Sequence, residues 1–345
     1  MRVTTSLLCA AVGLVLQQAT AFLPPASFPS SKPASATVLR MAAEAVEVPM
    51  DLIKKLRGMS GAPIMDCKKA LAEEKLDVEA AFDWLRKKGQ ATIAKRDRAT
   101  KEGLVALAVD GTRGVAVEVN SETDFVARNA DFQGFVAGAA KTALGLRQGA
   151  KPGVSDVEHA ALIAATGPTG ESLEKELANL VAKIREGMTL RRASQLVVDQ
   201  GVVACYVHNA AGPLMGQAGA LVGIETDATG EKLAQVEAMA KRLAMHVVAA
   251  NPLYLDSASV PAEVVEREKE VARQTALDAG KKPEVVEKMT EGRLRKYFEE
   301  VCLVQQNHML EEGNPQISDL FTKTAAELGV TLKLANFLKY RTGEE

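Results

Sequence analysis

The stretch that decides the fold is residues 104–126, which read LVALAVDGTRGVAVEVNSETDFV. Two apolar runs, 104–109 and 115–119, flank the sequence Asp-Gly-Thr-Arg at 110–113. Apolar runs on either side of a short glycine-containing turn predict a β-hairpin. A run with helical spacing, from Asp131 to Leu144, follows. The stretch therefore predicts a hairpin that leads into a helix.

The same pattern recurs about 100 residues later in the sequence. Residues 201–207 and 220–224 indicate strands, and a long helix is expected from about Glu231 to Ala250. Both hairpins end in Glu-Thr-Asp, at 122–124 and at 225–227. We therefore expect a duplicated β-hairpin–helix core. Its first copy spans 100–200 with a helical insert at 155–186, and its second copy spans 201–260 and 301–340.

The segment before the first hairpin has helical periodicity. Between residues 48 and 90, three apolar stripes recur at helical spacing, with Gly58 and Gly61 between the first two. Asp77 is expected to cap the third helix and Gly89 to end it. The segment predicts a three-helix module similar to ubiquitin-associated domains.

The segment after the second long helix is highly charged. Two helices are expected at 261–279 and 283–299, separated by Gly-Lys-Lys-Pro at 280–283. This pattern predicts a projecting antiparallel coiled-coil arm, 261–300, inserted in the second copy. A further helix and a short strand are expected between residues 316 and 338. The expected fold class is therefore α+β.

The first 46 residues have the composition of a targeting leader. Arg2 precedes a ten-residue apolar run, which is too short to span a bilayer, and a Ser- and Pro-rich stretch follows. Acidic residues are absent before Glu44. We expect a bipartite leader, a signal peptide followed by a plastid transit peptide, removed or disordered in the mature protein. Simple secretion and a mitochondrial address remain as alternatives.

Charge and motifs exclude several classes of function. The 42 basic and 44 acidic residues give a net charge of −2, which argues against nucleic-acid binding by bulk charge. A basic connector reads as a solvated hinge rather than a nucleic-acid patch, because no aromatic residue interleaves its cations: Lys87, Lys88, Lys95, Arg96 and Arg98. Triphosphate-loop, serine-hydrolase and zinc-protease motifs are absent, and the four cysteines form no C-x-x-C pair. A cysteine hydrolase using Cys67 is a weak alternative because that thiol falls on a buried stripe. We expect no catalytic residue, cofactor or metal site.

Three stretches together are highly specific. They are LRGMSGAPIMDCKKAL at 56–71, NSETDFVARN at 120–129 and AMHVVAA at 244–250, with EGRL at 291–294 and CLVQQ at 302–306 following in order. With these motifs the chain closely resembles the elongation factor Ts family over residues 48–340.

The resemblance implies a guanine-nucleotide exchange factor, not an enzyme, that displaces Mg²⁺ and GDP from elongation factor Tu. The expected partner is elongation factor Tu in its GDP-bound and nucleotide-free forms. Direct nucleotide binding, stable nucleic-acid binding and membrane association after processing are not expected. The resemblance assigns an exchange wedge to Asp124 and Phe125, with Thr123 and Val126 as its support. It also assigns partner contacts to four residues: Arg57, Ile64, Met65 and His246.

Some features depart from the family pattern. The second copy has Ala228 where the first has Phe125, so it should lack a wedge. Residues 185–192, 307–308 and an extra loop expected at 209–219 also differ. A competing interpretation is an adaptor or peptide-binding protein that uses the three-helix module, but it would explain only residues 50–89.

Overall fold

The computed structural model describes residues 47–94, 100–146, 151–280 and 282–344. The leader expected at 1–46 lies outside these residues, as do Lys95, Arg96 and Arg98 of the basic connector. In the described ranges no helix combines the length and apolar character needed to cross a membrane. The same ranges contain no group of three or more His, Cys, Asp or Glu side chains arranged to hold a metal ion.

The N-terminal module consists of α1 (Met50–Ser60), α2 (Ile64–Glu73) and α3 (Val78–Ala94). A small core of its own includes Leu56, Cys67 and Leu71. The Asp77 carboxylate accepts hydrogen bonds from the N–H groups of Glu79 and Ala80, so the predicted cap is confirmed. The predicted end at Gly89 is wrong, because α3 continues to Ala94. Gly89 stays helical where α3 packs against α7: a Cβ there would lie 3.6 Å from Ala182 Cα.

Seven strands in the described part of the chain form one antiparallel sheet. Its hydrogen-bonded order is β3-β4-β2-β1-β6-β5, with β7 paired to β6. The strand bounds are β1 Glu102–Asp110, β2 Arg113–Ser121, β3 Gly153–Asp156, β4 Met188–Val197, β5 Gly201–Gly212, β6 Met215–Thr226 and β7 Leu332–Arg341. This sheet, together with the helices, confirms the α+β class.

Two half-sheets, the first made of β3, β4, β2 and β1 and the second of β6, β5 and β7, meet at a short junction. Strands β1 and β6 pair only at Val105–Gly216 and Ala106–Met215, while the other ladders extend further. A buried cluster combines side chains from both halves, among them Leu107 and Leu196 from the first and Leu221 and Leu338 from the second. The halves approach so closely that a Cβ on Gly223 would lie 2.8 Å from Val198 Cγ1. Glycine is required there for space.

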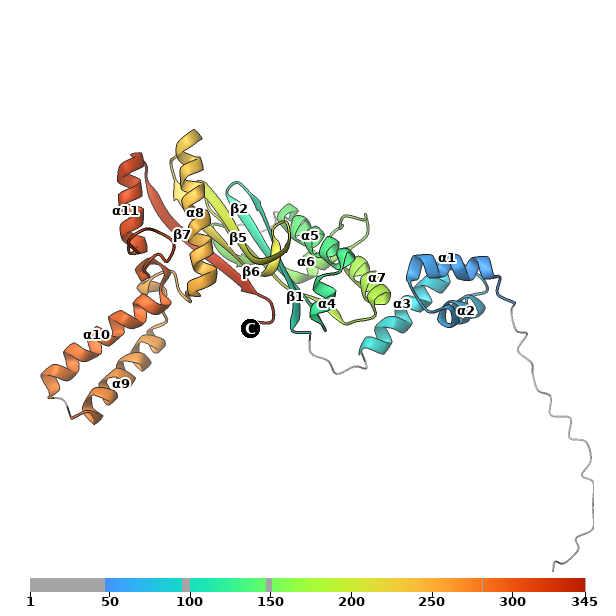
Figure 1. Cartoon of the computed structure of the whole chain (residues 1–345), viewed down its shortest axis with the longest axis horizontal. Coiled ribbons are helices and arrows are strands. Elements are labelled where there is room, and N and C mark those ends of the chain that lie inside the picture. Colours follow the sequence, from blue (N-terminus) through green and yellow to red (C-terminus); the bar gives the residue numbers. More distant parts are fainter. Residues whose placement is uncertain (1–46, 95–99, 147–150, 281, 345) are drawn as a thin grey trace, which may run out of the picture. The chain divides into compact units, whose positions relative to one another are not determined.

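Each half-sheet is covered by its own helices (Figure 1). The first carries α5 (Ala130–Gly145), α6 (His159–Ala164) and α7 (Leu173–Ile184); the second carries α8 (Gly230–Ala250) and α11 (Ile317–Leu328). A hairpin followed by a helix therefore occurs twice in the chain. The insert at 155–186 was expected to be helical, and α6 and α7 are; β3 at its start was not foreseen.

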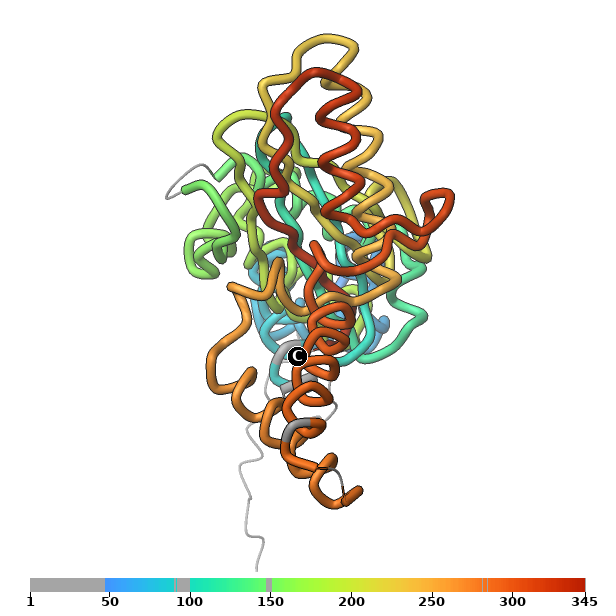
Figure 2. The backbone as a smooth tube through the Cα atoms, turned by 90° about the vertical axis from the view of Figure 1, so that its left-hand side faces the viewer, coloured from blue at the N-terminus to red at the C-terminus, as the bar shows by residue number. Residues whose placement is uncertain are grey.

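Helices α9 (Ala262–Asp278) and α10 (Pro283–Val301) pack against each other, and Figures 1 and 2 show them side by side. The buried face between them includes Ala272, Ala276 and Val286. Short 3₁₀ turns, 257–259 and 303–305, flank this pair. The extra loop expected at 209–219 is wrong: these residues extend β5 and β6, which turn at Pro213 and Leu214. Cross-strand hydrogen bonds order these residues. Their small side chains show little alternation of polar and apolar residues, so the sequence did not indicate strands here.

Candidate functional site

The residues Thr123–Val126, here called the tip, lie where β2 gives way to the short helix α4 (Asp124–Ala127). Thr123 has an extended backbone, with φ −131°, and the helix begins after it. Because neighbouring helical residues point about 100° apart, Phe125 and Val126 face different surroundings. Phe125 is 74% exposed and Val126 is 3% exposed, packed in the core of the first half-sheet. Phe125 is therefore not a core residue in this structure.

The base of the tip is fixed by hydrogen bonds to the segment that follows α7. The Glu122 backbone N–H donates to Gly187 O at 3.2 Å, and Gly187 N–H donates to the Glu122 carboxylate at 2.8 Å. The Thr123 hydroxyl donates to the Glu186 carboxylate at 2.8 Å, and the Ser121 hydroxyl donates to Thr123 O at 2.9 Å. Sequence reasoning missed the roles of Glu186 and Gly187, because 63 residues or more separate them from their partners.

The other end of the tip is tied to α5. The Asn129 side chain accepts from the N–H groups of Asp131 and Phe132, and Gln133 donates to Ala127 O at 2.9 Å. These bonds fix the helix that leads away from the tip. An exposed aromatic ring thus stands on a backbone held on both sides.

Asp124 is the charged neighbour of the exposed ring. Its carboxylate lies 3.7 Å from an Arg128 guanidinium nitrogen, and both side chains are more than half exposed. An ion pair this exposed is weak, on the order of 0–1 kcal/mol. The Asp124 carboxylate can therefore exchange this partner for backbone N–H donors, or repel an anion brought close to it.

The corresponding residues of the second copy are arranged differently. Ala228 is 6% exposed, and its N–H donates to the Thr226 hydroxyl at 3.1 Å. The Asp227 carboxylate accepts from the Thr331 N–H at 2.7 Å, at the start of β7. This backbone hydrogen bond lowers the pKa of the Asp227 carboxyl. No exposed aromatic side chain follows the Glu-Thr-Asp sequence here.

A second apolar surface lies on the N-terminal module. Ile64 and Met65 occupy the first turn of α2 and are 44% and 73% exposed, while Cys67 one turn on is fully buried. Arg57 on α1 is exposed as well. We call Arg57, Ile64 and Met65 the module face. Met59, 49% exposed on α1, is a further apolar residue of this module that sequence reasoning did not single out.

The structure does not expose His246 as it exposes the other three partner-contact residues predicted from sequence. Its ring is 1% exposed, stacked on His308 with ring centroids 5.1 Å apart. Nδ1 accepts from the Met309 N–H at 3.3 Å, which leaves Nε2 to donate to Gln306 Oε1 at 2.9 Å. Burial lowers the pKa of both histidines, that of His308 to about 4. Both rings are therefore neutral near pH 7.

A direct contact between His246 and a partner would require the segment over it to move aside. As the structure stands, the ring holds that segment in place. Met309 and Leu310, next in the chain, are 59% and 49% exposed. These two residues, which no sequence motif marked, are the apolar surface at this position.

Comparisons with known proteins agree on one family. The family model described as elongation factor TS matches residues 122–344. Elongation factor Ts of Paramagnetospirillum magneticum is 48% identical over 299 residues, covering 86% of this chain and 92% of that protein. Elongation factor Ts of Rhodospirillum rubrum is 43% identical, covering 86% and 93%. That of Rickettsia bellii is 41% identical over 293 residues, covering 85% and 91%.

Proposed function

The chain belongs to the elongation factor Ts family, and on that premise we propose that the tip is the element that opens the nucleotide site of its partner. The protein is a guanine-nucleotide exchange factor for elongation factor Tu, and it is not an enzyme. The finer assignment of roles to residues in the following paragraphs is our proposal.

The observation that supports this role for the tip is the exposure of Phe125. Its side chain is 74% exposed on a backbone anchored at both ends. A stiff apolar ring gains free energy when it enters a pocket on the partner, and the anchored base keeps it from folding away. Inserted near the Mg²⁺ site, Phe125 displaces the elements that support the ion. Asp124 competes for N–H donors or repels phosphate. The affinity for Mg²⁺ and GDP falls, and both are displaced.

The size of the effect follows from linkage. Weakening nucleotide affinity about 10³-fold requires about 4 kcal/mol of coupling between the two binding events. The coupling is reciprocal, so bound GDP weakens the grip of the factor by the same amount. The factor therefore binds the GDP-bound and nucleotide-free forms, the latter more tightly. It needs no nucleotide, nucleic-acid or membrane contact of its own.

The module face supplies an independent grip. Ile64 and Met65 offer apolar area, and Arg57 offers a planar cation suited to carboxylates. A grip of this kind holds the factor on the GTPase while the tip acts. The α9–α10 pair would serve as a coiled-coil arm.

We also propose that residues 1–46 direct the protein to a plastid. The leader is acid-free until Glu44 and has two parts of different composition. Fusing residues 1–46 to a fluorescent protein in an alga with secondary plastids should label the plastid stroma. Labelling of mitochondria or of the secretory route would overturn this assignment.

The test of the exchange mechanism measures release of a fluorescent GDP from elongation factor Tu. The full chain at micromolar concentration should accelerate release strongly, and Asp124→Asn should slow the accelerated rate. Binding without any acceleration would instead favour an adaptor that uses the three-helix module. Equal acceleration by the parent and the Asp124→Asn and Phe125→Ala variants would remove the tip from the mechanism.

A further inference from the structure

Six consecutive residues, Ala182–Gly187, run from the last turn of α7 (Leu173–Ile184) into the following segment, and they contact both the N-terminal module and the base of the tip. On one side, Ala182 packs against Gly89 of α3 and Arg185 pairs with Asp66 of α2. On the other side, Glu186 and Gly187 hold the base of the tip. The tip and the module that carries the module face are thus anchored on the same short segment.

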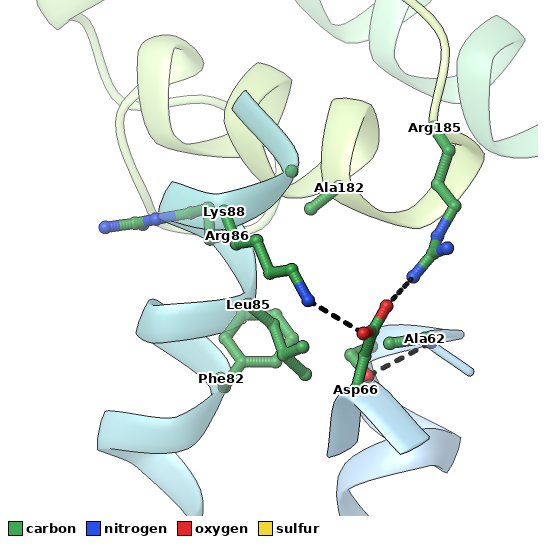
Figure 3. Close-up of a pocket in the computed structure, with 10 residues that line it drawn as sticks. Ala62, Asp66, Phe82, Leu85, Arg86, Lys88, Ala182 and Arg185 are labelled. Atoms are coloured by element: carbon green, nitrogen blue, oxygen red, sulfur yellow. Dashed lines mark hydrogen bonds and ion pairs between the residues drawn. The ribbon is translucent and has the colours of Figure 1, made fainter. Parts of the chain in front are cut away.

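One carboxylate links the module to this segment by an ion pair. Asp66 accepts a hydrogen bond from Lys88 Nζ at 2.8 Å and pairs with Arg185 Nη2 at 3.4 Å; Figure 3 shows it between the two cations. Lys88 lowers the pKa of the Asp66 carboxyl, with a smaller contribution from Arg185, so the group is charged at neutral pH. Met65 of the module face is the preceding residue in the chain.

Apolar packing around this carboxylate is incomplete. A cavity of about 250 Å³ lies beside it, lined by residues of the module and of α7, among them Ala62, Phe82, Leu85 and Ala182 (Figure 3). A cavity removes close contacts that would otherwise hold two elements in register. Among the described residues, the ion pair between Asp66 and Arg185 is therefore one of the few contacts that orient the module on α7, beside the packing of Gly89 against Ala182.

The tip side of the segment is tied by three hydrogen bonds, those of Glu122 and Thr123 to Glu186 and Gly187. A further ion pair, Lys183 to Asp131 at 2.7 Å, joins α7 to the first turn of α5. These ties fix the far side of the segment.

We propose that Arg185–Gly187 is a joint that holds the module face and the tip at a fixed separation, with Asp66 and Arg185 as positioning residues. The proposal rests on the function proposed above. When two contacts are held at the right separation, formation of the first gives the second a high effective concentration. The second contact then forms without another bimolecular encounter. Loosening the joint should weaken binding to the partner. The tip itself, and the maximal rate of GDP release that it produces, should stay nearly unchanged.

The test variant is Asp66→Asn, which removes the charge and keeps the shape. Its matched control is Asp83→Asn, because the Asp83 carboxylate pairs only within its own helix, with Arg86 at 3.3 Å in the pairs described. The first readout is time-resolved fluorescence anisotropy of Trp84, the single tryptophan of the chain, which lies in α3. Asp66→Asn should add a fast component from independent motion of the module, and Asp83→Asn should not.

The second readout is GDP release titrated with the factor. Asp66→Asn should raise the half-saturating concentration about fivefold, the upper range for an exposed ion pair, and leave the maximal rate within about twofold. In a Met65→Ala background the same substitution should add less than about twofold, because the contact it positions is already gone.

Three results would overturn the joint: unchanged anisotropy in Asp66→Asn, an unchanged half-saturating concentration, or a full additional fivefold loss in the Met65→Ala background. An equal effect of Asp83→Asn would mean that loss of a negative charge on the module, and not loss of the contact with Arg185, causes the change. That result would also overturn the joint. If the parent protein fails to accelerate GDP release, the proposed function fails. The anisotropy of Trp84 then still decides whether the joint exists.

Discussion

Strands β2 and β6 each end in the sequence Glu-Thr-Asp, and the residue that follows is Phe125 in one case and Ala228 in the other. Phe125 is 74% exposed and Ala228 is 6% exposed. In the second copy, Asp227 accepts from Thr331 and Glu225 pairs with Lys333 at 2.8 Å, so both acidic side chains fasten the start of β7. A shared motif therefore presents an exposed aromatic side chain in one copy and supports the fold in the other.

Substitution of Phe125 should affect GDP release more than any substitution in the second copy. Phe125→Ala is expected to slow GDP release roughly 30- to 1000-fold, because truncating a buried aromatic at an interface costs about 2–4 kcal/mol. The exposed ring makes few contacts in the free protein, so the melting temperature should stay within about 2 °C. The control is Ala228→Ser, which should leave GDP release unchanged, while its buried hydroxyl lowers stability by about 1–3 kcal/mol. A large fall in the melting temperature of Phe125→Ala would mean that the ring supports the fold.

The converse substitution should act on stability. Ala228→Phe places a large ring where the second core already surrounds the methyl group. Overpacking of this kind costs about 1–3 kcal/mol, measurable as a lower urea midpoint at unchanged slope. Combined with Phe125→Ala it should not restore GDP release. Restored release would show that either copy can act as the wedge, which would remove the distinction drawn here.

Local patterns predicted the two hairpins, their helices and the cap at Asp77, because each depends on neighbours in sequence. The same patterns missed β4, whose run TLRRASQLV at 189–197 mixes polar and apolar residues. Its Arg191 and Arg192 are satisfied by the buried Glu118 on β2, a partner more than 70 residues away. The segment that covers His246 was not predicted for the same reason, because it lies about 60 residues further along the chain.

The base of the tip can be tested separately from the ring. Thr123→Val keeps the shape of the side chain and removes the donor to Glu186. Losing one hydrogen bond of about 1 kcal/mol should lower the maximal GDP-release rate about fivefold, because the ring remains but its backbone is looser. Thr322→Val on α11, which loses a hydroxyl bonded to Ser318 O, is the matched control and should leave the rate unchanged. Equal maximal rates for Thr123→Val and the parent would mean that the hydrogen bond from Thr123 to Glu186 does not hold the tip backbone in place.

The smallest effect is expected at Asp227 and concerns pH. The hydrogen bond from Thr331 favours the charged carboxylate and sets its pKa below the ordinary 3.8. Because the pKa in the folded protein is depressed, this contribution to stability is present above the ordinary value and is lost as pH falls through the lower one. In an NMR titration, the Asp227 carboxyl carbon and the Thr331 amide should therefore shift together, with a midpoint below 3.8. Asp227→Asn should abolish the coupled shift and leave GDP release unchanged, whereas Asp124→Asn should slow release. A midpoint at or above the ordinary value would mean that Asp227 does not hold β7, and the contrast between the two copies would then rest on Phe125 and Ala228 alone.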